Sequence, residues 1–268
     1  MNTQQTRWAA VEAIIAAAEA RGAIVGASIV APDGERRAWH GDRRFHAAST
    51  VKVAVMVEIF RQIERGNLTR RDLVTLDDAD KVAGTGVLSG MHDGLPLTVD
   101  DLLYLMMAIS DNTATNLLVD LAGLDAVNAT MVELGLSAAS AMHRKMLGRL
   151  PQGEEPENWA TPDDHATLIA AIVADRAASP ESCAAMRALL ATQQCTTRFK
   201  RCLPASGVTW GSKIGALPEV CNDVGFVTGP GGTIVLALFV EGLPELEAEP
   251  VIGEIVRAAA IATGVFAV

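Results

Sequence analysis

Residues 49–66 of the 268-residue chain read STVKVAVMVEIFRQIERG, a run that is apolar on nearly every side of a helix until it reaches Gly66. A helix that is apolar all round is buried in a core, and glycine commonly follows the last helical residue. The sequence therefore predicts a buried helix over about 49–65 that runs through the middle of the molecule. Ser49 and Lys52, at its start, fall on one face of this helix because they are three residues apart.

Before and after this helix in the sequence, alternating apolar residues and turn pairs predict β-strands near both ends of the chain. Five strands are expected, at 23–30, 36–40, 208–216, 223–228 and 233–241. The first two form a hairpin around Asp33-Gly34, and the glycine-rich run 229–232 turns the last pair.

Helices are predicted between these strands and at both termini. Residues 7–20 and 247–262 have helical patterns, and further helices start at Thr98, Thr161 and Ser179, where capping residues precede Asp101, Pro162 and Pro180. The fold class is therefore α/β of the α+β kind, with an antiparallel five-stranded sheet flanked by the N- and C-terminal helices beside an all-helical lobe. We expect a single domain, 1–268, made of a sheet lobe (1–45 and 205–268) and a mostly helical lobe (46–204), with a cleft between them.

Composition narrows the classes of partner. Half of the residues are hydrophobic and the net charge is −10, with no basic run, so neither nucleic acid nor a membrane surface is an expected partner. The four cysteines have neither metal-site nor CxxC spacing and are predicted to be buried thiols, and no cofactor or metal site is expected. Residues 1–10 do not have the pattern of a signal peptide, so the expected location is cytoplasmic, or periplasmic or secreted if a signal peptide has been removed.

Three short motifs carry the candidate chemistry. Ser49-Thr50-Val51-Lys52 begins the buried helix, where desolvation and the helix dipole favour the neutral form of a lysine that could accept the serine proton. Ser110-Asp111-Asn112 lies at a junction between two helical segments, and Lys213-Ile214-Gly215 opens a late strand. Each motif alone has an ordinary structural explanation: an N-cap serine with a snorkelling lysine, an Asx cap, and a lysine that protects an edge strand.

Taken together and in this order, the motifs resemble the SxxK, SDN and KTG signatures of the penicillin-recognising serine hydrolases, most closely the class A β-lactamases. The resemblance implies a β-lactamase/transpeptidase-like fold and roles for seven residues. Ser49 would be the acylated nucleophile, Lys52 its activating amine, and Ser110 the proton shuttle to the leaving group. Asn112 would hold the substrate amide, Lys213 would set the potential of the pocket, and Gly215 would let the ligand lie against the backbone. The backbone N–H groups of Ser49 and Ala216 would hold the oxyanion.

Two positions depart from the family pattern. The resemblance implies a glutamate that activates the deacylating water at a position where this chain has Lys145, and Glu155 and Glu157 lie closer to Pro162. Either the loop is rebuilt so that Glu155 or Glu157 reaches the cleft, or there is no general base of this kind. We favour the second, because acidic residues in a Gly/Pro/Glu-rich loop are usually solvated. Ile214 stands where the family has a threonine whose hydroxyl binds the substrate carboxylate, so the preferred substrate is expected to carry no carboxylate there.

The sequence favours a serine hydrolase that forms an acyl-enzyme at Ser49 and hydrolyses a β-lactam or a related amide or ester. One alternative is a β-lactam-binding or sensing protein that is acylated but deacylates poorly. Another is a DD-peptidase-like peptidoglycan carboxypeptidase. In each case the expected partner is a small-molecule substrate.

Overall fold

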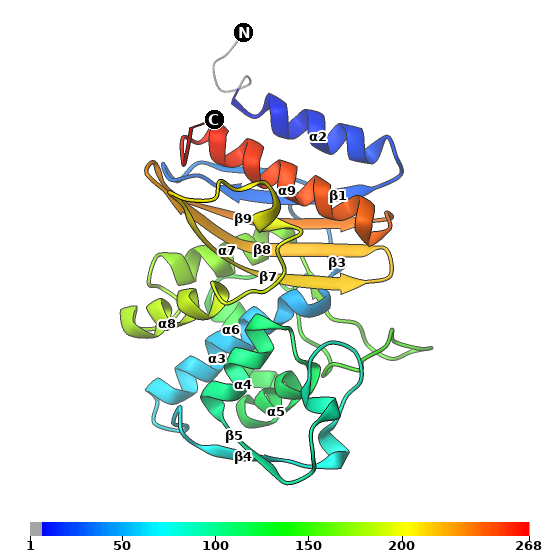
Figure 1. Ribbon diagram of the computed structural model, residues 1–268, viewed down its shortest axis with the longest axis vertical. Helices are drawn as coiled ribbons and strands as arrows, with labels where there is room; N and C mark the ends of the chain where they lie inside the picture. Colours follow the sequence, from blue (N-terminus) through cyan, green and yellow to red (C-terminus); the bar gives the residue numbers. More distant parts are fainter. Residues whose placement is uncertain (1–6, 268) are drawn as a thin grey trace.

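An antiparallel five-stranded sheet lies at the centre of the computed structural model, which describes residues 7–267 (Figure 1). The strand order is β2-β1-β9-β8-β7. The strands are β1 (Ile24–Val30), β2 (Arg36–Trp39), β7 (Thr209–Leu217), β8 (Val220–Gly229) and β9 (Gly232–Glu241). Because β1 pairs with β9, with Ile24 opposite Glu241, the two ends of the chain share one sheet. The predicted fold class is therefore confirmed.

Helices cover both faces of this sheet. The terminal helices α2 (Ala9–Glu19) and α9 (Glu245–Ala262) pack on one face, and α7 (Pro162–Val173) packs on the other (Figure 1). Successive side chains of a strand point to opposite faces, so Leu238 of β9 joins the core beneath the terminal helices while Phe239 joins the core shared with the helical region. A strand that is buried on both faces, as β9 is, needs an unbroken run of apolar residues.

The buried helix of the sequence analysis is α3 (Lys52–Glu64), and every residue from Lys52 to Phe60 is buried. It begins three residues later than predicted, because Ala48–Val51 form a 3₁₀ turn, η1, instead of the first α-helical turn. Ala48 has a φ of +47°, which no α-helical residue adopts. Around α3 lie the helices α4 (Val99–Ala108), α5 (Asn112–Ala122), α6 (Leu124–Glu133) and α8 (Pro180–Leu190).

The predicted helix starts are confirmed at their caps. The Thr98 hydroxyl accepts a hydrogen bond from the backbone N–H of Asp101, whose carboxylate in turn accepts from the Thr98 backbone N–H. Thr161 and Ser179 cap α7 and α8 in the same way, each followed by a proline in the first turn. Each cap satisfies one N–H group that the helix itself leaves without a partner.

Two small sheets were not predicted. β3 (Phe45–His46) pairs with β6 (Trp159–Ala160), and β4 (Leu73–Leu76) pairs with β5 (Leu95–Thr98). Strands of two to four residues are too short to show an alternating pattern. The β3–β6 pair ties the segment that leads into Ser49 to the segment that leads into α7.

The division into a sheet lobe and a helical lobe stays a prediction. Residues 1–6 and 268, at the two ends of the predicted domain, lie outside the described residues. Most of the segment 1–10, which the signal-peptide expectation concerned, lies outside them as well. The four cysteines are free thiols; Cys183 and Cys221 are buried as predicted, whereas Cys195 and Cys202 are only half-buried.

Within residues 7–267, every helix is too short or too polar to cross a membrane. The same residues contain no cluster of three or more His, Cys, Asp or Glu side chains that could hold a metal ion.

Candidate active site

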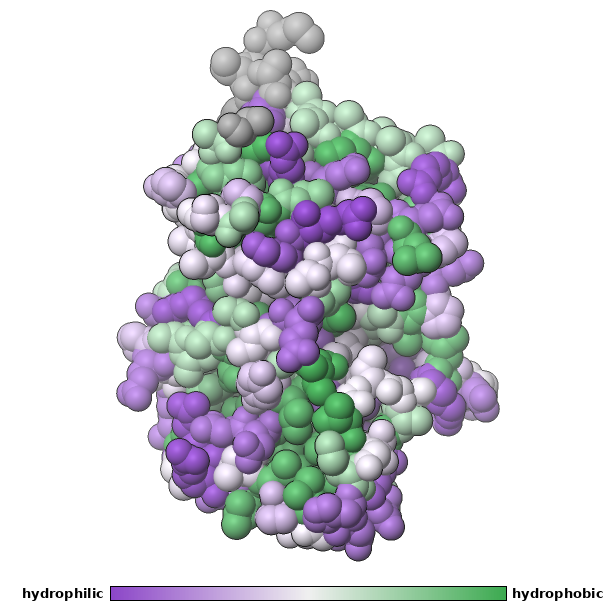
Figure 2. All heavy atoms as spheres, in the orientation of Figure 1, coloured by the Kyte–Doolittle hydropathy of each residue, from purple (hydrophilic) through white to green (hydrophobic). Residues whose placement is uncertain are grey.

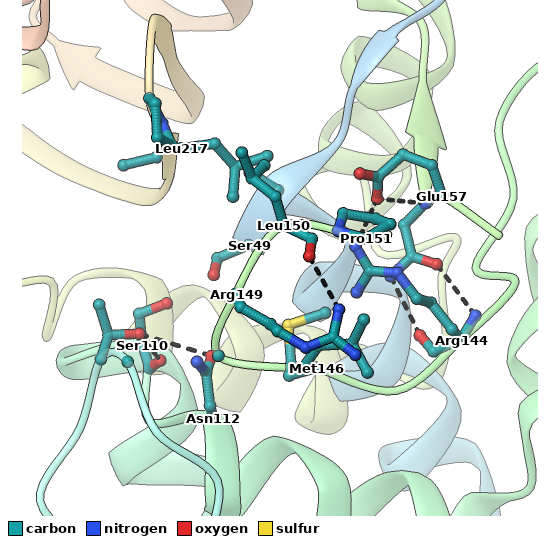
Figure 3. Close-up of a pocket in the computed structure, with 18 of the residues that line it drawn as sticks. Ser49, Ser110, Asn112, Arg144, Met146, Arg149, Leu150, Pro151, Glu157 and Leu217 are labelled. Atoms are coloured by element: carbon teal, nitrogen blue, oxygen red, sulfur yellow. Dashed lines mark hydrogen bonds and ion pairs between the residues drawn. The ribbon is translucent and has the colours of Figure 1, made fainter. Parts of the chain in front are cut away.

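A cavity of about 570 Å³ opens between the end of β7, the η1 turn and two loops (Figure 3). We call these the 83–88 loop and the 143–158 loop. Four of the predicted site residues line the cavity: Ser49, Ser110, Asn112 and Ala216. The other three do not line it and are buried: Lys52, Lys213 and Gly215.

Ser49 lies in the η1 turn, half-buried at the wall of the cavity. The preceding residue, Ala48, adopts the left-handed conformation already noted, which costs a residue with a Cβ about 1 to 3 kcal/mol and is typical of functional sites. The turn is held from the sheet side by β7, which approaches it very closely at Gly215. A Cβ at Gly215 would lie only 3.0 Å from the Ala47 carbonyl oxygen and 3.2 Å from the Ser49 nitrogen. Gly215 thus makes room for the Ser49 turn, whereas the sequence analysis expected it to make room for the ligand.

The Lys52 amine is fully buried directly beneath the cavity. Its Nζ donates to the Ser110 carbonyl oxygen at 2.7 Å, the Ser110 Oγ at 3.1 Å and the Asn112 Oδ1 at 2.9 Å. None of these three hydrogen bonds goes to Ser49. Burial, reinforced by the nearby charge of Lys213, lowers the pKa of the Lys52 amine well below its ordinary value of 10.5. The direction of this shift favours the neutral amine, as the sequence analysis expected from desolvation. A neutral amine carries two N–H groups, so in that form the Ser110 hydroxyl donates to the amine instead of accepting from it.

Ser110 and Asn112 are positioned by the 83–88 loop. Ser110 has a φ of +60°, and its carbonyl oxygen accepts from the Thr85 hydroxyl at 2.7 Å as well as from Lys52. The Asn112 backbone N–H donates to the Thr85 carbonyl at 3.0 Å, and the Asn112 Nδ2 donates to the Ala83 carbonyl at 3.1 Å. One N–H of the Asn112 amide is left to face the cavity, since the group carries two.

Asp111, between them, is a structural residue. Its Oδ2 accepts from the backbone N–H groups of Val87 and Leu88 at 2.6 and 2.9 Å, and its Oδ1 caps α5 by accepting from Ala114 at 2.9 Å. Gly86 permits this contact, because its φ is +114° and a Cβ there would lie 2.2 Å from the Asp111 Oδ2.

We therefore expect Gly86→Ala to destabilise the protein by about 1 to 3 kcal/mol, since it combines a disfavoured backbone conformation with a steric clash against a buried carboxylate. Urea denaturation of the variant measures this loss. Gly90→Ala is the matched control, because a Cβ at Gly90 meets no atom within 4 Å. Equal stabilities of the two variants would contradict the structural role assigned to Asp111.

Lys213 lies on the edge strand β7 with its side chain fully buried, and its Nζ donates to the Ile214 carbonyl at 2.9 Å. Burial lowers its pKa to about 7, opposed by the carboxylate of Asp223 and assisted by the guanidinium of Arg198. Arg198 is a residue that the sequence analysis missed. It is 1 % exposed and donates to the carbonyl oxygens of Gly215 at 2.9 Å and Asn222 at 2.8 Å. Arg198 therefore supports β7 and β8 from the segment that precedes them in the sequence.

The 143–158 loop carries Lys145, Glu155 and Glu157, the three residues that the sequence analysis considered for the deacylating base. Lys145, at the position where the family pattern implies a glutamate, is exposed and ion-paired with Asp120. The next residue, Met146, is anchored through its backbone, whose N–H and carbonyl both bond the Asn116 side chain at 2.8 and 2.9 Å. Glu155 is solvated as expected, and its hydrogen bonds to Arg149 hold its pKa at about 2.

Glu157, in contrast, is not solvated, and the expectation for it is wrong. Its side chain is 12 % exposed and lines the cavity (Figure 3). The Glu157 Oε1 accepts from the Arg144 guanidinium at 2.7 Å and from the Asn158 backbone N–H at 2.6 Å. The burial of Asn158, whose Oδ1 accepts from the backbone N–H groups of His143 and Arg144, draws this end of the loop inward.

Sequence reasoning also missed further cavity residues, which are Thr85, Ile109, Arg144, Leu150 and Leu217. Thr85 had a local signal, since it lies between two glycines, Gly84 and Gly86, whose positive φ angles let the chain fold over Asn112 and Asp111. Ile109 directly precedes the Ser110 motif, whereas Arg144, Leu150 and Leu217 have no such local signal, because only tertiary contacts bring them to the cavity.

Residues 6–262 match the model of a family described as the beta-lactamase enzyme family. Among curated proteins, the chain is 24 % identical to beta-lactamase BRO-1 of Moraxella catarrhalis over 160 residues, which are 59 % of this chain. That alignment spans 51 % of BRO-1, so this chain matches about half of its length. A beta-lactamase of Streptomyces albus G is 30 % identical over 226 residues, which are 77 % of this chain and 68 % of that protein.

Among solved structures, the beta-lactamase from Sphaerobacter thermophilus DSM 20745 is 53 % identical to this chain, with a TM-score of 0.94. The alignment covers 97 % of this chain and 98 % of that one. The structure of PBP-A is 26 % identical with a TM-score of 0.84, covering 94 % and 95 %.

Proposed function

This chain belongs to the beta-lactamase enzyme family, and we propose that it is a serine hydrolase that forms an acyl-enzyme at Ser49 and hydrolyses a β-lactam or a related amide or ester. The observation that carries the proposal is the buried Lys52 amine. It has a lowered pKa and is bonded to Ser110 and Asn112 beneath the cavity that Ser49 lines.

In the acylation step, the Ser49 Oγ attacks the carbonyl carbon of the substrate and its proton passes to the neutral Lys52 amine. The bond from the carbonyl carbon to the leaving nitrogen or oxygen then breaks. Ser110, whose Oγ lies 3.1 Å from the Lys52 Nζ, delivers the proton from the amine to the leaving atom. Asn112 keeps one amide N–H for the substrate, as described above. The step is balanced, because the proton that Ser49 gives up leaves on the departing group.

The oxyanion that forms in this step is held by backbone N–H groups of Ser49 and Ala216. Both residues line the same cavity, and Ser49 lies in the first turn of a helical segment, where N–H groups have no partner within the helix. The close approach of β7 to the Ser49 nitrogen at Gly215, the residue before Ala216, supports this assignment. Donors of this kind are worth about a hundredfold or more in turnover.

For the deacylation step we propose Glu157 as the group that activates water. It is a carboxylate that lines the cavity, and its Oε1 is already bonded to Arg144 and Asn158, which leaves its Oε2 as the acceptor for water. Because Arg144 and the Asn158 backbone N–H already occupy its Oε1, only one oxygen is left to take the proton of water, so we expect deacylation to be slower than acylation.

Glu157→Gln is expected to slow the hydrolysis of the acyl-enzyme about a hundredfold while leaving the acylation rate near that of the wild type. Single-turnover mass spectrometry of the Ser49 adduct separates the two rates. The matched control is Glu154→Gln, which removes the same charge three residues away at an exposed position outside the cavity. Adduct lifetimes that are the same in both variants would remove Glu157 from the mechanism.

The proposed function as a whole is tested by incubating the protein with a fluorescent penicillin and with nitrocefin. Turnover of nitrocefin with a transient adduct supports the hydrolase. A persistent adduct without turnover is the result expected of the binding or sensing alternative. That alternative is not favoured, because it depended on a cavity without a carboxylate and because the 53 % identical structure is described as a beta-lactamase.

A further inference from the structure

We infer that the cavity selects substrates that carry an uncharged, apolar group beside β7, such as an ester, and not the free carboxylate of an ordinary penicillin. The inference rests on the proposed function, and it extends the expectation for Ile214 to the whole cavity. The structure supplies two independent reasons: both arginines that line the cavity in the described part of the chain are already paired with carboxylates, and the wall beside β7 is apolar.

Arg144 and Arg149 are the cationic side chains that line the cavity in the described part of the chain. The Arg144 Nε donates to the Pro156 carbonyl at 2.8 Å, its NH1 to the Lys145 carbonyl at 3.1 Å and its NH2 to Glu157 at 2.7 Å. All three nitrogens of this guanidinium therefore have acceptors within the 143–158 loop, and its charge is neutralised by the Glu157 carboxylate.

Arg149 is also paired with acceptors within the 143–158 loop. Its NH1 and NH2 bind the two carboxylate oxygens of Glu155 at 2.6 and 2.8 Å, and NH1 also donates to the Leu150 carbonyl at 2.9 Å. This pair is partly exposed and screened by water, but a substrate carboxylate would have to displace Glu155 to use the same two N–H groups.

The two cations of the sheet side, Lys213 and Arg198, are buried and have acceptors of their own. Lys213 is fully buried, and its amine donates to the Ile214 carbonyl. Arg198 directs its NH1 to two backbone carbonyls, and its NH2 and Nε to Glu245 and Glu249. Neither side chain lines the cavity.

What faces the cavity from β7 is apolar. Ile214, Leu217 and Pro218 line this side. Figure 3 shows Leu150, on the 143–158 loop, facing the end of β7 that carries Leu217. A carboxylate placed here would give up its water without gaining a charge-assisted hydrogen bond, while the net charge of −10 adds a weak general repulsion of anions. An ester at the same place would lose no charge hydration and would gain contacts with Ile214 and Leu217.

The experiment compares two compounds that differ only at this group, benzylpenicillin and its methyl ester. The rate of Ser49 acylation by each is followed by intact-protein mass spectrometry. We expect the ester to acylate wild-type protein at least about tenfold faster than the free acid. Ile214→Thr, which restores a hydroxyl, should shift the acid-to-ester ratio of rates towards the acid by about tenfold. Ile214→Val has nearly the same shape as threonine without the hydroxyl, so it should keep the ester preference, whatever its effect on the absolute rates.

The outcomes separate this inference from the function on which it rests. Equal or faster acylation by the free acid in the wild type would overturn the inference and leave the proposed function standing. A shift of the same size in Ile214→Val and Ile214→Thr would show that side-chain volume, not hydrogen bonding, sets the preference, and would also overturn it. Failure of both compounds to label Ser49 would overturn the proposed function and the inference together.

Discussion

Ser49→Ala should remove covalent labelling by penicillins completely and lower hydrolysis by about 10⁴ to 10⁶-fold. The size of this loss follows from the arrangement of the cavity. Ser49 lies on its wall in the η1 turn, and the two partners proposed for it, Lys52 and Ser110, have no substitute nucleophile to activate. Mass spectrometry after incubation with penicillin and a nitrocefin assay measure the two effects.

The fold should survive this change, because Ser49 is only half-buried and alanine fits the space of serine. The matched control is Ser206→Ala, at an exposed position outside the cavity, which should keep wild-type labelling. Hydrolysis by folded Ser49→Ala protein at the wild-type rate would refute the assignment of the nucleophile.

Much of the fold could be predicted because its signals are local. The capping box of Thr98 and Asp101 and the proline that follows Thr161 mark helix starts within a single turn of chain. A sheet shared by both ends of the chain followed from apolar strands at both ends, since each had to bury its faces, but the pairing of β1 with β9 itself was not predicted. The start of α3 was placed too early because the left-handed Ala48 has no sequence signal, as alanine favours helices.

The candidate site could be predicted only where motif spacing reflects geometry. Lys52, Ser110 and Asn112 are brought together as the motifs suggested, although Lys52 bonds to Ser110 and Asn112 and not to Ser49. Glu157 was expected to be solvated because acidic residues in a Gly/Pro/Glu-rich loop usually are. Its inward position depends on an ion pair with Arg144, thirteen residues earlier, a contact that only the folded loop creates. Arg198 was missed for the same reason, because it supports strands that follow it by 17 to 24 residues.

Lys52→Met should slow the acylation of Ser49 about 10² to 10⁴-fold, the loss expected when a general base is removed. Methionine has similar length, so the helix packing around position 52 should persist. In the wild type the acylation rate should rise with pH as the Lys52 amine loses its proton. Its midpoint should lie well below 10.5, because burial and the charge of Lys213 lower the pKa of that amine. The variant should lack this rise, which stopped-flow acylation across a pH series measures.

The same lowered pKa has a consequence for stability that does not depend on any substrate. In the unfolded chain the lysine keeps its ordinary pKa, so between the folded and unfolded pKa values the unfolded state binds more protons than the folded state. The free energy of unfolding must then increase as the pH rises towards 10.5, and Lys213, with a folded pKa of about 7, contributes in the same direction.

Urea denaturation of Lys52→Met should therefore show a smaller increase over this interval than the wild type. Lys145→Met, which removes an exposed lysine outside the cavity, should match the wild type both in this slope and in the acylation rate. An acylation rate unchanged in Lys52→Met, together with an unchanged pH slope, would mean that the amine is charged in the folded protein and cannot be the base.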